Sequence, residues 1–86
     1  MHTVELLEQA LALAEALGYQ IRQEWLDGGG GGVCEIAGKK WVFIDLALGT
    51  ADQLDELIEG LREDPDLGNA EIPAALAPLM RPRRAA

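Results

Sequence analysis

The chain has 86 residues, of which 49% are hydrophobic and 26% are charged, and its net charge at neutral pH is -8. This length supports one domain with a thin core, because a chain of this size buries only about 60% of its unfolded surface. No apolar run approaches the roughly 18 residues that span a bilayer, and the start lacks the basic region of a secretory signal. A single cysteine excludes an intrachain disulfide. We therefore expect a cytoplasmic protein with no membrane partner.

The charges are unevenly divided along the chain. Residues 1–80 hold all 15 acidic residues but only 4 of the 7 basic ones, so this part carries -11, whereas Arg81, Arg83 and Arg84 make the end basic. Because an acidic body repels phosphate backbones, we expect no nucleic-acid partner. The composition predicts a single α+β domain over residues 1–80 and a flexible basic tail over 81–86.

Residues 4–17 have the periodicity of an amphipathic helix, with their apolar side chains on one half of the circumference. Thr3 is the expected N-cap, and Gly18 is placed to end the helix in the left-handed conformation. Residues 19–26 follow as a strand, in which Tyr19, Ile21 and Trp25 alternate with polar residues.

A run of five glycines, Gly28 to Gly32, separates this strand from a predicted hairpin. A phosphate-binding loop requires a helix after its glycines, but a strand follows here, so we interpret the run as a flexible connector. The hairpin strands are residues 33–37 and 41–46. We predict a three-residue turn, Gly38 to Lys40, because it places the following residues on one face: Cys34, Ile36, Val42, Ile44 and Leu46.

Residues 50–63 have the pattern of a second helix. Thr50 and Gln53 match a capping box, an apolar face follows at helical spacing, and Pro65 enforces a stop nearby. A short helical segment is expected from Pro73. The predicted fold is thus α+β, with element order α-β-β-β-α: a three-stranded antiparallel sheet, two helices packed on one of its faces and a short C-terminal helical segment.

Several residues were considered as sites for chemistry. Cys34 lacks a basic neighbour, and we favour a buried core residue over a reactive thiol. One cysteine and one histidine cannot build a zinc site without several carboxylates, so neither a metal nor a cofactor is expected. Asp45 is the best single candidate for acid–base catalysis, although a residue at a strand end more often caps the next turn. Nothing in the sequence indicates a small-molecule ligand or a catalytic set.

The predicted sheet has more apolar residues than helices on one of its faces can cover. If both helices cover the Val42 face, Trp41 and Phe43 lie on the opposite face, and in a simple meander their strand is also an edge. Their cover is the C-terminal segment, a second copy of the chain or another protein. We expect a homodimer. The candidate interface residues are Trp41, Phe43, Ile72, Leu76, Leu79 and Met80.

Residues 31–46 combine Gly-Gly-x-Cys, a Gly-Lys hairpin and a hydrophobic strand ending in Asp, and an acidic helix follows. In this pattern the chain resembles a group of small uncharacterised bacterial proteins of unknown function. The glycine-led hairpin before a helix is also similar, more distantly, to the front of some zinc peptidase domains. Those domains require H-E-x-x-H on the helix, and residues 53–61 contain no histidine.

Two functional hypotheses follow. The first is a non-enzymatic interaction or accessory domain that works through an apolar sheet face or edge and associates with itself. The alternative is a small enzyme or redox-sensing protein that uses Cys34.

Overall fold

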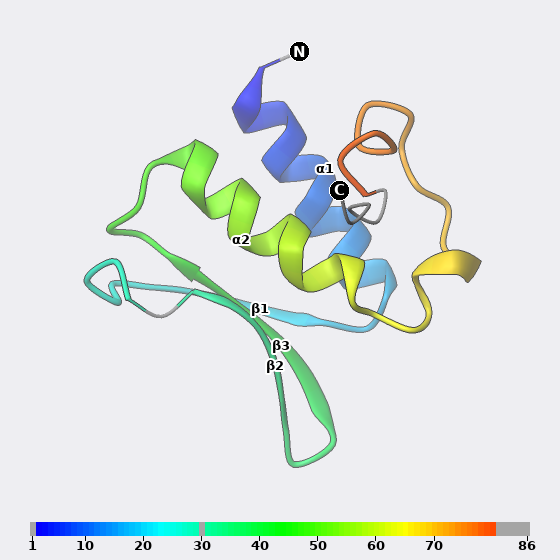
Figure 1. Cartoon of the computed structure of the whole chain (residues 1–86). Helices are drawn as coiled ribbons and strands as arrows, with labels where there is room; N and C mark the ends of the chain where they lie inside the picture. Colours follow the sequence, from blue (N-terminus) through cyan, green and yellow to red (C-terminus); the bar gives the residue numbers. More distant parts are fainter. Residues whose placement is uncertain (1, 30, 81–86) are drawn as a thin grey trace, which may run out of the picture.

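The computed structural model describes residues 2–29 and 31–80. Its regular elements are α1 (Thr3–Ala16), β1 (Gln20–Glu24), β2 (Gly32–Ile36), β3 (Lys39–Asp45), α2 (Thr50–Arg62) and a short 3₁₀ helix, η1 (Leu67–Asn69). The two α-helices pack against each other and lie on the same side of the sheet (Figure 1). The predicted α+β fold with two helices on one face is therefore confirmed.

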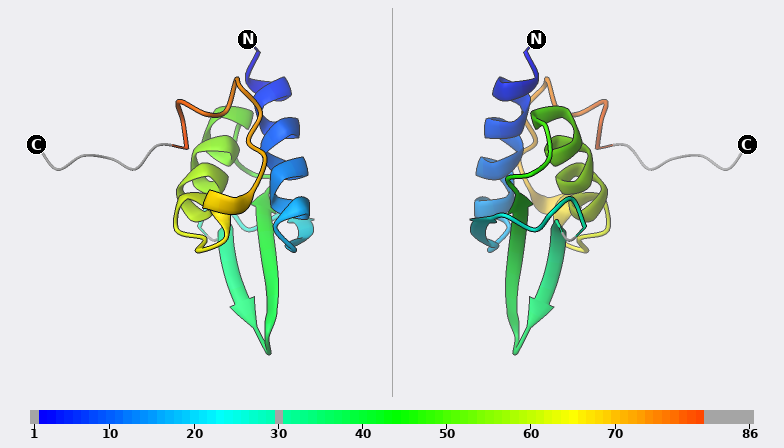
Figure 2. Two further views of the ribbon diagram at one scale, coloured as in Figure 1. Left: turned by 90° about the vertical axis from the view of Figure 1, so that its right-hand side faces the viewer. Right: turned by 90° about the vertical axis from the view of Figure 1, so that its left-hand side faces the viewer.

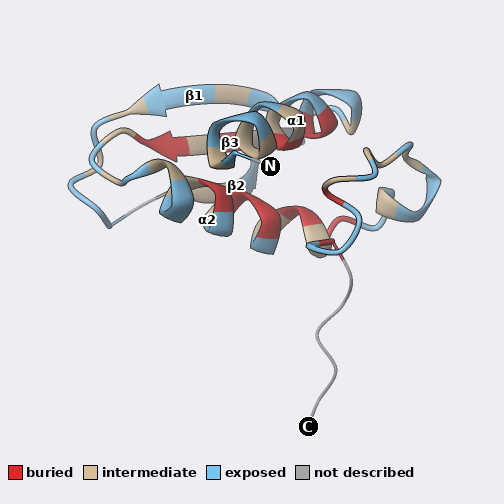
Figure 3. Cartoon of the chain, turned by 90° about the horizontal axis from the view of Figure 1, so that it is seen from above, coloured by how far each residue is buried: buried red, intermediate tan, exposed pale blue. Residues whose placement is uncertain are grey.

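The sheet is mixed, and its strand order is β1-β3-β2. β3 pairs with β1 in parallel and with β2 in antiparallel. The expected antiparallel meander, with β3 at an edge, is wrong. The physical reason is that β3 is apolar on both faces and gains a hydrogen-bonded neighbour on each side, whereas the polar β1 tolerates the edge. Figure 3 shows the contrast, with most of β1 exposed and the end of β3 buried.

The β2–β3 hairpin has a two-residue turn. Ile36 pairs with Lys39, and the turn residues Ala37 and Gly38 have φ of 52° and 79°, as a type I′ turn requires. The predicted three-residue turn is therefore wrong. Because one residue of register reverses every side chain of a strand, Cys34 and Ile36 lie on the opposite face from Val42.

The end of α1 follows the prediction, and both helices begin within one residue of their expected starts, but their N-caps differ. Gly18 has φ of 96°, and the N–H groups of Gly18 and Tyr19 donate to Glu15 and Ala14, the two bonds of a Schellman motif. Neither predicted N-cap is correct, because His2 and Gly49 occupy these positions without a side-chain cap bond. The Gln53 amide instead donates to the carbonyls of Asp45 and Leu48, which fixes the turn before α2.

The core lies between the helices and the inner face of the sheet, and the C-terminal segment closes it. Core residues come from α1, β3, α2 and residues 76 and 80: Ala10, Leu13, Ala14, Val42, Ile44, Leu54, Leu57, Ile58, Leu61, Leu76 and Met80. The segment after Pro73 forms successive turns rather than a regular helix, with Ala77 N bonded to Pro73 O and Met80 N to Leu76 O. It returns along the helices, away from the outer face of the sheet (Figures 1 and 2).

Candidate functional site

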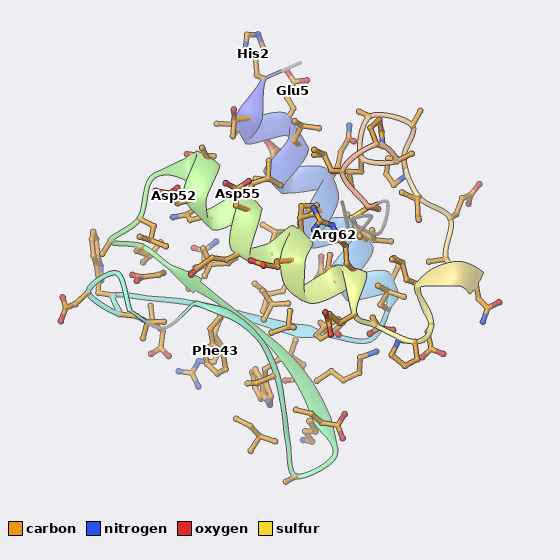
Figure 4. All side chains as sticks on the ribbon, viewed as in Figure 1. His2, Glu5, Phe43, Asp52, Asp55 and Arg62 are labelled. Carbon is orange, nitrogen blue, oxygen red and sulfur yellow. The ribbon has the colours of Figure 1, made fainter. Side chains whose placement is uncertain are left out.

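The face of the sheet that points away from the helices, here called the outer face, is open. Strand alternation and the registers place ten side-chain positions on it: Gln20, Arg22, Glu24, Gly32, Cys34, Ile36, Lys39, Trp41, Phe43 and the buried Asp45. Phe43 can be seen below the sheet in Figure 4, on the side opposite the helices. None of the described helices or loops packs across the middle of this face, since the core cluster lies wholly on the other side.

The apolar centre of the outer face is a pair of stacked aromatic rings. The centroids of Trp41 and Phe43 are 6.1 Å apart, with 24° between the ring planes. Cys34 pairs with Trp41 across the hairpin and is exposed, and Ile36 is 53% exposed. These four side chains form an aromatic and aliphatic patch on a sheet that has helices on one side only.

The outer face differs in charge from the rest of the molecule. Residues 1–80 carry -11, but the charged residues on this face are Arg22, Glu24, Lys39 and Asp45, two positive and two negative, so they sum to zero. Arg22 and Glu24 lie 3.7 Å apart and both are well exposed. A second acidic body can therefore approach this face with less repulsion than it meets elsewhere.

The structure divides the six predicted interface residues between two places. Trp41 and Phe43 lie on the outer face, as expected from the alternation along β3. Leu76 and Met80 are core residues of the chain itself, so neither is available to a partner. The other two lie near them: Ile72 packs against the same core, and Leu79 is 37% exposed beside α2. The basic residues 81–86 lie outside the described part of the chain.

Cys34 is exposed rather than buried, which corrects the expectation of a core cysteine. The cause is the two-residue turn, which moves β2 by one position and turns Cys34 outward. On the outer face it lies across from Trp41 and diagonal to Lys39, whereas Lys40 points to the inner side. His2 stands at the start of α1, at the far end of the molecule (Figure 4).

Asp45 is fully buried, and its carboxylate binds backbone N–H groups. Its carboxylate accepts hydrogen bonds from Leu26 N (3.0 Å), Gly28 N (2.6 Å) and Ala47 N (2.9 Å). Burial by itself raises the pKa of Asp45, but the N–H groups of these three residues outweigh it and hold the pKa below its usual range. The carboxylate thus ties the β1–β2 connection to the end of β3, and it has the capping role that was the alternative to catalysis.

The glycine run belongs to the connection from β1 to β2, and the conformation of this connection depends on individual glycines. The connection must pass the end of β3, because β1 and β2 lie on opposite sides of that strand. Gly28 has φ of 81° and directs its N–H to Asp45, and a Cβ on Gly31 would collide with the Glu56 carboxylate. The described glycines therefore permit a close passage that larger residues would block.

A second polar cluster lies on the inner side, and the sequence did not indicate it. The buried Asp64 carboxylate accepts from the Tyr19 hydroxyl (2.7 Å), from Lys40 Nζ (2.8 Å) and from Asp66 N (2.7 Å). Lys40 Nζ also donates to Leu17 O (2.7 Å) and lies 4.5 Å from the centre of the Tyr19 ring. This cluster links the ends of both helices to the hairpin.

The cluster changes the acidity of two of its members. Burial raises the pKa of Asp64, but hydrogen bonds from Lys40 and Tyr19 outweigh it, so the net pKa is lowered. Burial also raises the pKa of Tyr19, and the hydrogen bond to Asp64 and its negative charge raise it further. Asp64 therefore stays ionised and Tyr19 neutral near pH 7, which suits a structural ion pair.

Two negative findings apply to residues 2–29 and 31–80. Their His, Cys, Asp and Glu side chains form no group of three or more that could hold a metal ion. No helix within these ranges combines the length and the apolar composition needed to cross a bilayer.

Comparisons with known proteins add no relative: no family model matches the chain, and neither the curated proteins nor the solved structures contain a match. The resemblance to small bacterial proteins of unknown function stays a prediction.

Proposed function

We propose that this chain is a non-enzymatic protein-interaction domain that associates with a second copy of itself through the outer face. The observation that carries the proposal is the patch on the sheet face opposite the core, in which Cys34 and Ile36 are exposed and the stacked rings of Trp41 and Phe43 are half-buried. Apolar patches of this kind are typical of interfaces, because removing them from water contributes roughly 25 cal/mol per Å².

The charges favour a second copy over an acidic or a strongly basic partner. Each body carries -11 outside the tail, and the outer face, whose charges sum to zero, is where two such bodies repel least. A two-fold arrangement is self-complementary, so Arg22 of one copy can meet Glu24 of the other at the rim. Another protein with a flat apolar face is the alternative partner for the same surface.

The proposal also includes a cytoplasmic location. A free, exposed thiol at the centre of an interface stays reduced in the cytoplasm, whereas an oxidising compartment would convert it to a disulfide.

Sedimentation equilibrium of the intact chain and two matched variants tests self-association. Ile36→Lys places a charge on the outer face, and Val4→Lys makes a similar change on α1, where the valine is 55% exposed against 53% for Ile36. We expect a dimer for the wild type and for V4K, and a monomer for I36K with unchanged circular dichroism. A wild-type chain that stays monomeric at millimolar concentration, or a dimer unaffected by I36K, contradicts the proposal.

The alternative function is a redox or catalytic role for Cys34, and the exposure of its thiol favours keeping it. Thiol reactivity requires a neighbouring base or cation, and the nearest candidate on the same face is Lys39. Alkylation by iodoacetamide tests this role. If Cys34 reacts no faster than glutathione at the same pH, a redox or catalytic role of its thiol is excluded.

A further inference from the structure

A groove runs between α2 and the free edge of β2, on a different surface from the outer face. It consists of two hollows of about 330 and 310 Å³ that share Val33, Gly60 and Glu63 as lining residues, and the close contact between Val33 and Gly60 lies at their common border. We call it the β2-edge groove. Its strand side comprises Gly31, Gly32, Val33, Cys34 and Glu35, and its helix side comprises Glu56, Glu59, Gly60, Glu63, Asp64, Pro65 and Asp66.

The edge of β2 is open to a further strand. β2 has one hydrogen-bonded neighbour, β3, so its other edge presents backbone donors and acceptors that no described strand pairs. Its five residues include neither Lys nor Pro, the residues that commonly protect an edge. Gly32, together with the preceding Gly31, offers no side chain that would cover the backbone at this end.

The negative charge of the β2-edge groove favours a positively charged ligand. Glu56, Glu59 and Glu63 are three and four residues apart, so they form one stripe of α2. The stripe rises about 10 Å along the helix, which is the length of about three residues in an extended strand. Among the described residues, the base that lines this groove is Lys40, and it is already bound to Asp64.

We propose that the β2-edge groove binds an extended, basic peptide segment of another protein. The peptide adds a strand beside β2, and every second side chain, a lysine or arginine, faces the glutamate stripe of α2. A second copy of this chain is a poor occupant, because pairing two β2 edges brings two acidic stripes together. The proposal does not depend on self-association, since it uses a different surface.

The test uses the full chain and a fluorescein-labelled peptide of alternating arginine and valine, followed by fluorescence anisotropy. The groove variant is E56Q/E59Q/E63Q. Its matched control is E5Q/E8Q/E15Q, which removes three exposed glutamates from α1 and changes the net charge equally. A second peptide carries N-methyl groups at alternate backbone nitrogens, which keeps its charge but prevents strand pairing.

We expect the groove variant to weaken binding by about tenfold or more, because the three negative charges that attract the basic side chains of the peptide are lost, and the control variant by less than twofold. The N-methylated peptide should also lose about tenfold. Equal losses in the two triple variants, undiminished binding of the N-methylated peptide or no binding by the wild type overturns the proposal.

Two further outcomes are decisive. Tighter peptide binding by R81Q/R83Q/R84Q would mean that the basic end of the chain competes, which overturns the assignment to another protein. Amide NMR shifts on adding the peptide should concentrate at residues 31–35. Shifts concentrated at Trp41 and Phe43 would place the peptide on the outer face and overturn the groove.

Discussion

Gly60 determines how closely α2 approaches β2, and its replacement is the sharpest test of the packing. A Cβ added at Gly60 would collide with Cγ2 of Val33 and would lie 2.8 Å from its Cγ1 and 3.1 Å from its Cβ. Rotation about χ1 can replace one methyl group of Val33 by the hydrogen on Cβ but not both, and Cβ itself does not move, so the side chain cannot turn fully out of the way. Accommodation of an alanine therefore requires α2 or β2 to move.

The size of the effect follows from two opposing terms. In an ordinary helix interior, Gly→Ala stabilises by about 1 kcal/mol, because glycine loses more backbone entropy on folding. Overpacking a closely fitted contact costs about 1–3 kcal/mol. We expect the cost of overpacking to exceed the gain in backbone entropy. Gly60→Ala should therefore lower the unfolding free energy by about 1 kcal/mol, which corresponds to several degrees in Tm.

Urea unfolding in a double-mutant cycle measures this contact. In a Val33→Ala background the colliding methyl groups are absent, so G60A should become neutral or stabilising, with a coupling energy of about 1–2 kcal/mol. Gly68→Ala is the control, since its added Cβ meets no atom within 4 Å and should change stability by less than about 0.5 kcal/mol. A G60A protein more stable than the wild type would refute the close approach of α2 to β2.

Three further measurements test other contacts. The pKa of Asp64 is lower in the folded chain than in the unfolded one, so its stabilisation is complete above about pH 5 and is lost progressively as pH falls below about 4 towards the lowered pKa of the folded chain. Asp64→Asn should cost about 2 kcal/mol at pH 7 and flatten the urea-unfolding profile between pH 3 and 7, and parallel profiles would contradict this. Ala37→Asn should stabilise by about 0.5–1 kcal/mol in thermal unfolding, because asparagine accepts the positive φ of the turn better than alanine, and a loss would argue against a type I′ turn. Alkylation of Cys34 should slow as protein concentration rises, because the proposed interface covers the thiol, and a rate independent of concentration would exclude Cys34 from it.

The features that the sequence predicts correctly are those determined by residues close together in the chain. The helices begin and end within a residue or two of their expected limits, and Gly18 adopts the left-handed conformation that its position predicted. These features depend on periodicity and on end signals that lie within a few positions of each other. The separation of Trp41 and Phe43 from Val42 follows from alternation within one strand and was predicted equally well.

Strand order and hairpin register could not be read in the same way, because they depend on contacts between distant segments. The sequence of β3 contains one signal for strand order, because a strand that is apolar on both faces suits the centre of a sheet. For the hairpin, the three-residue turn is predicted because it collects the apolar residues on one face, whereas the observed two-residue turn requires a positive φ at Ala37, which alanine rarely adopts. That single residue decided the face of Cys34.

The cluster around Asp64 had no sequence signal at all. Tyr19 and Asp64 are 45 positions apart, and Lys40 belongs to a third segment. A lysine near a hairpin tip and an aspartate after a helix are each ordinary surface residues in isolation. The fold alone brings them together, and the buried carboxylate is satisfied only because all three segments converge on it.

The two proposed surfaces meet at β2, which predicts that they influence each other. Side chains of β2 form part of the outer face, while its free edge forms one wall of the groove. A peptide strand added at that edge would extend the sheet, and its alternate side chains would enlarge the apolar outer face. Peptide binding should therefore tighten self-association, and by linkage the dimer should bind the peptide more tightly by the same factor.

Sedimentation equilibrium with and without the arginine–valine peptide measures this factor, which we expect to be severalfold. The I36K variant should remain monomeric while still binding the peptide. A dimer constant unaffected by saturating peptide would mean that the added strand does not continue the sheet, even if both surfaces bind their partners.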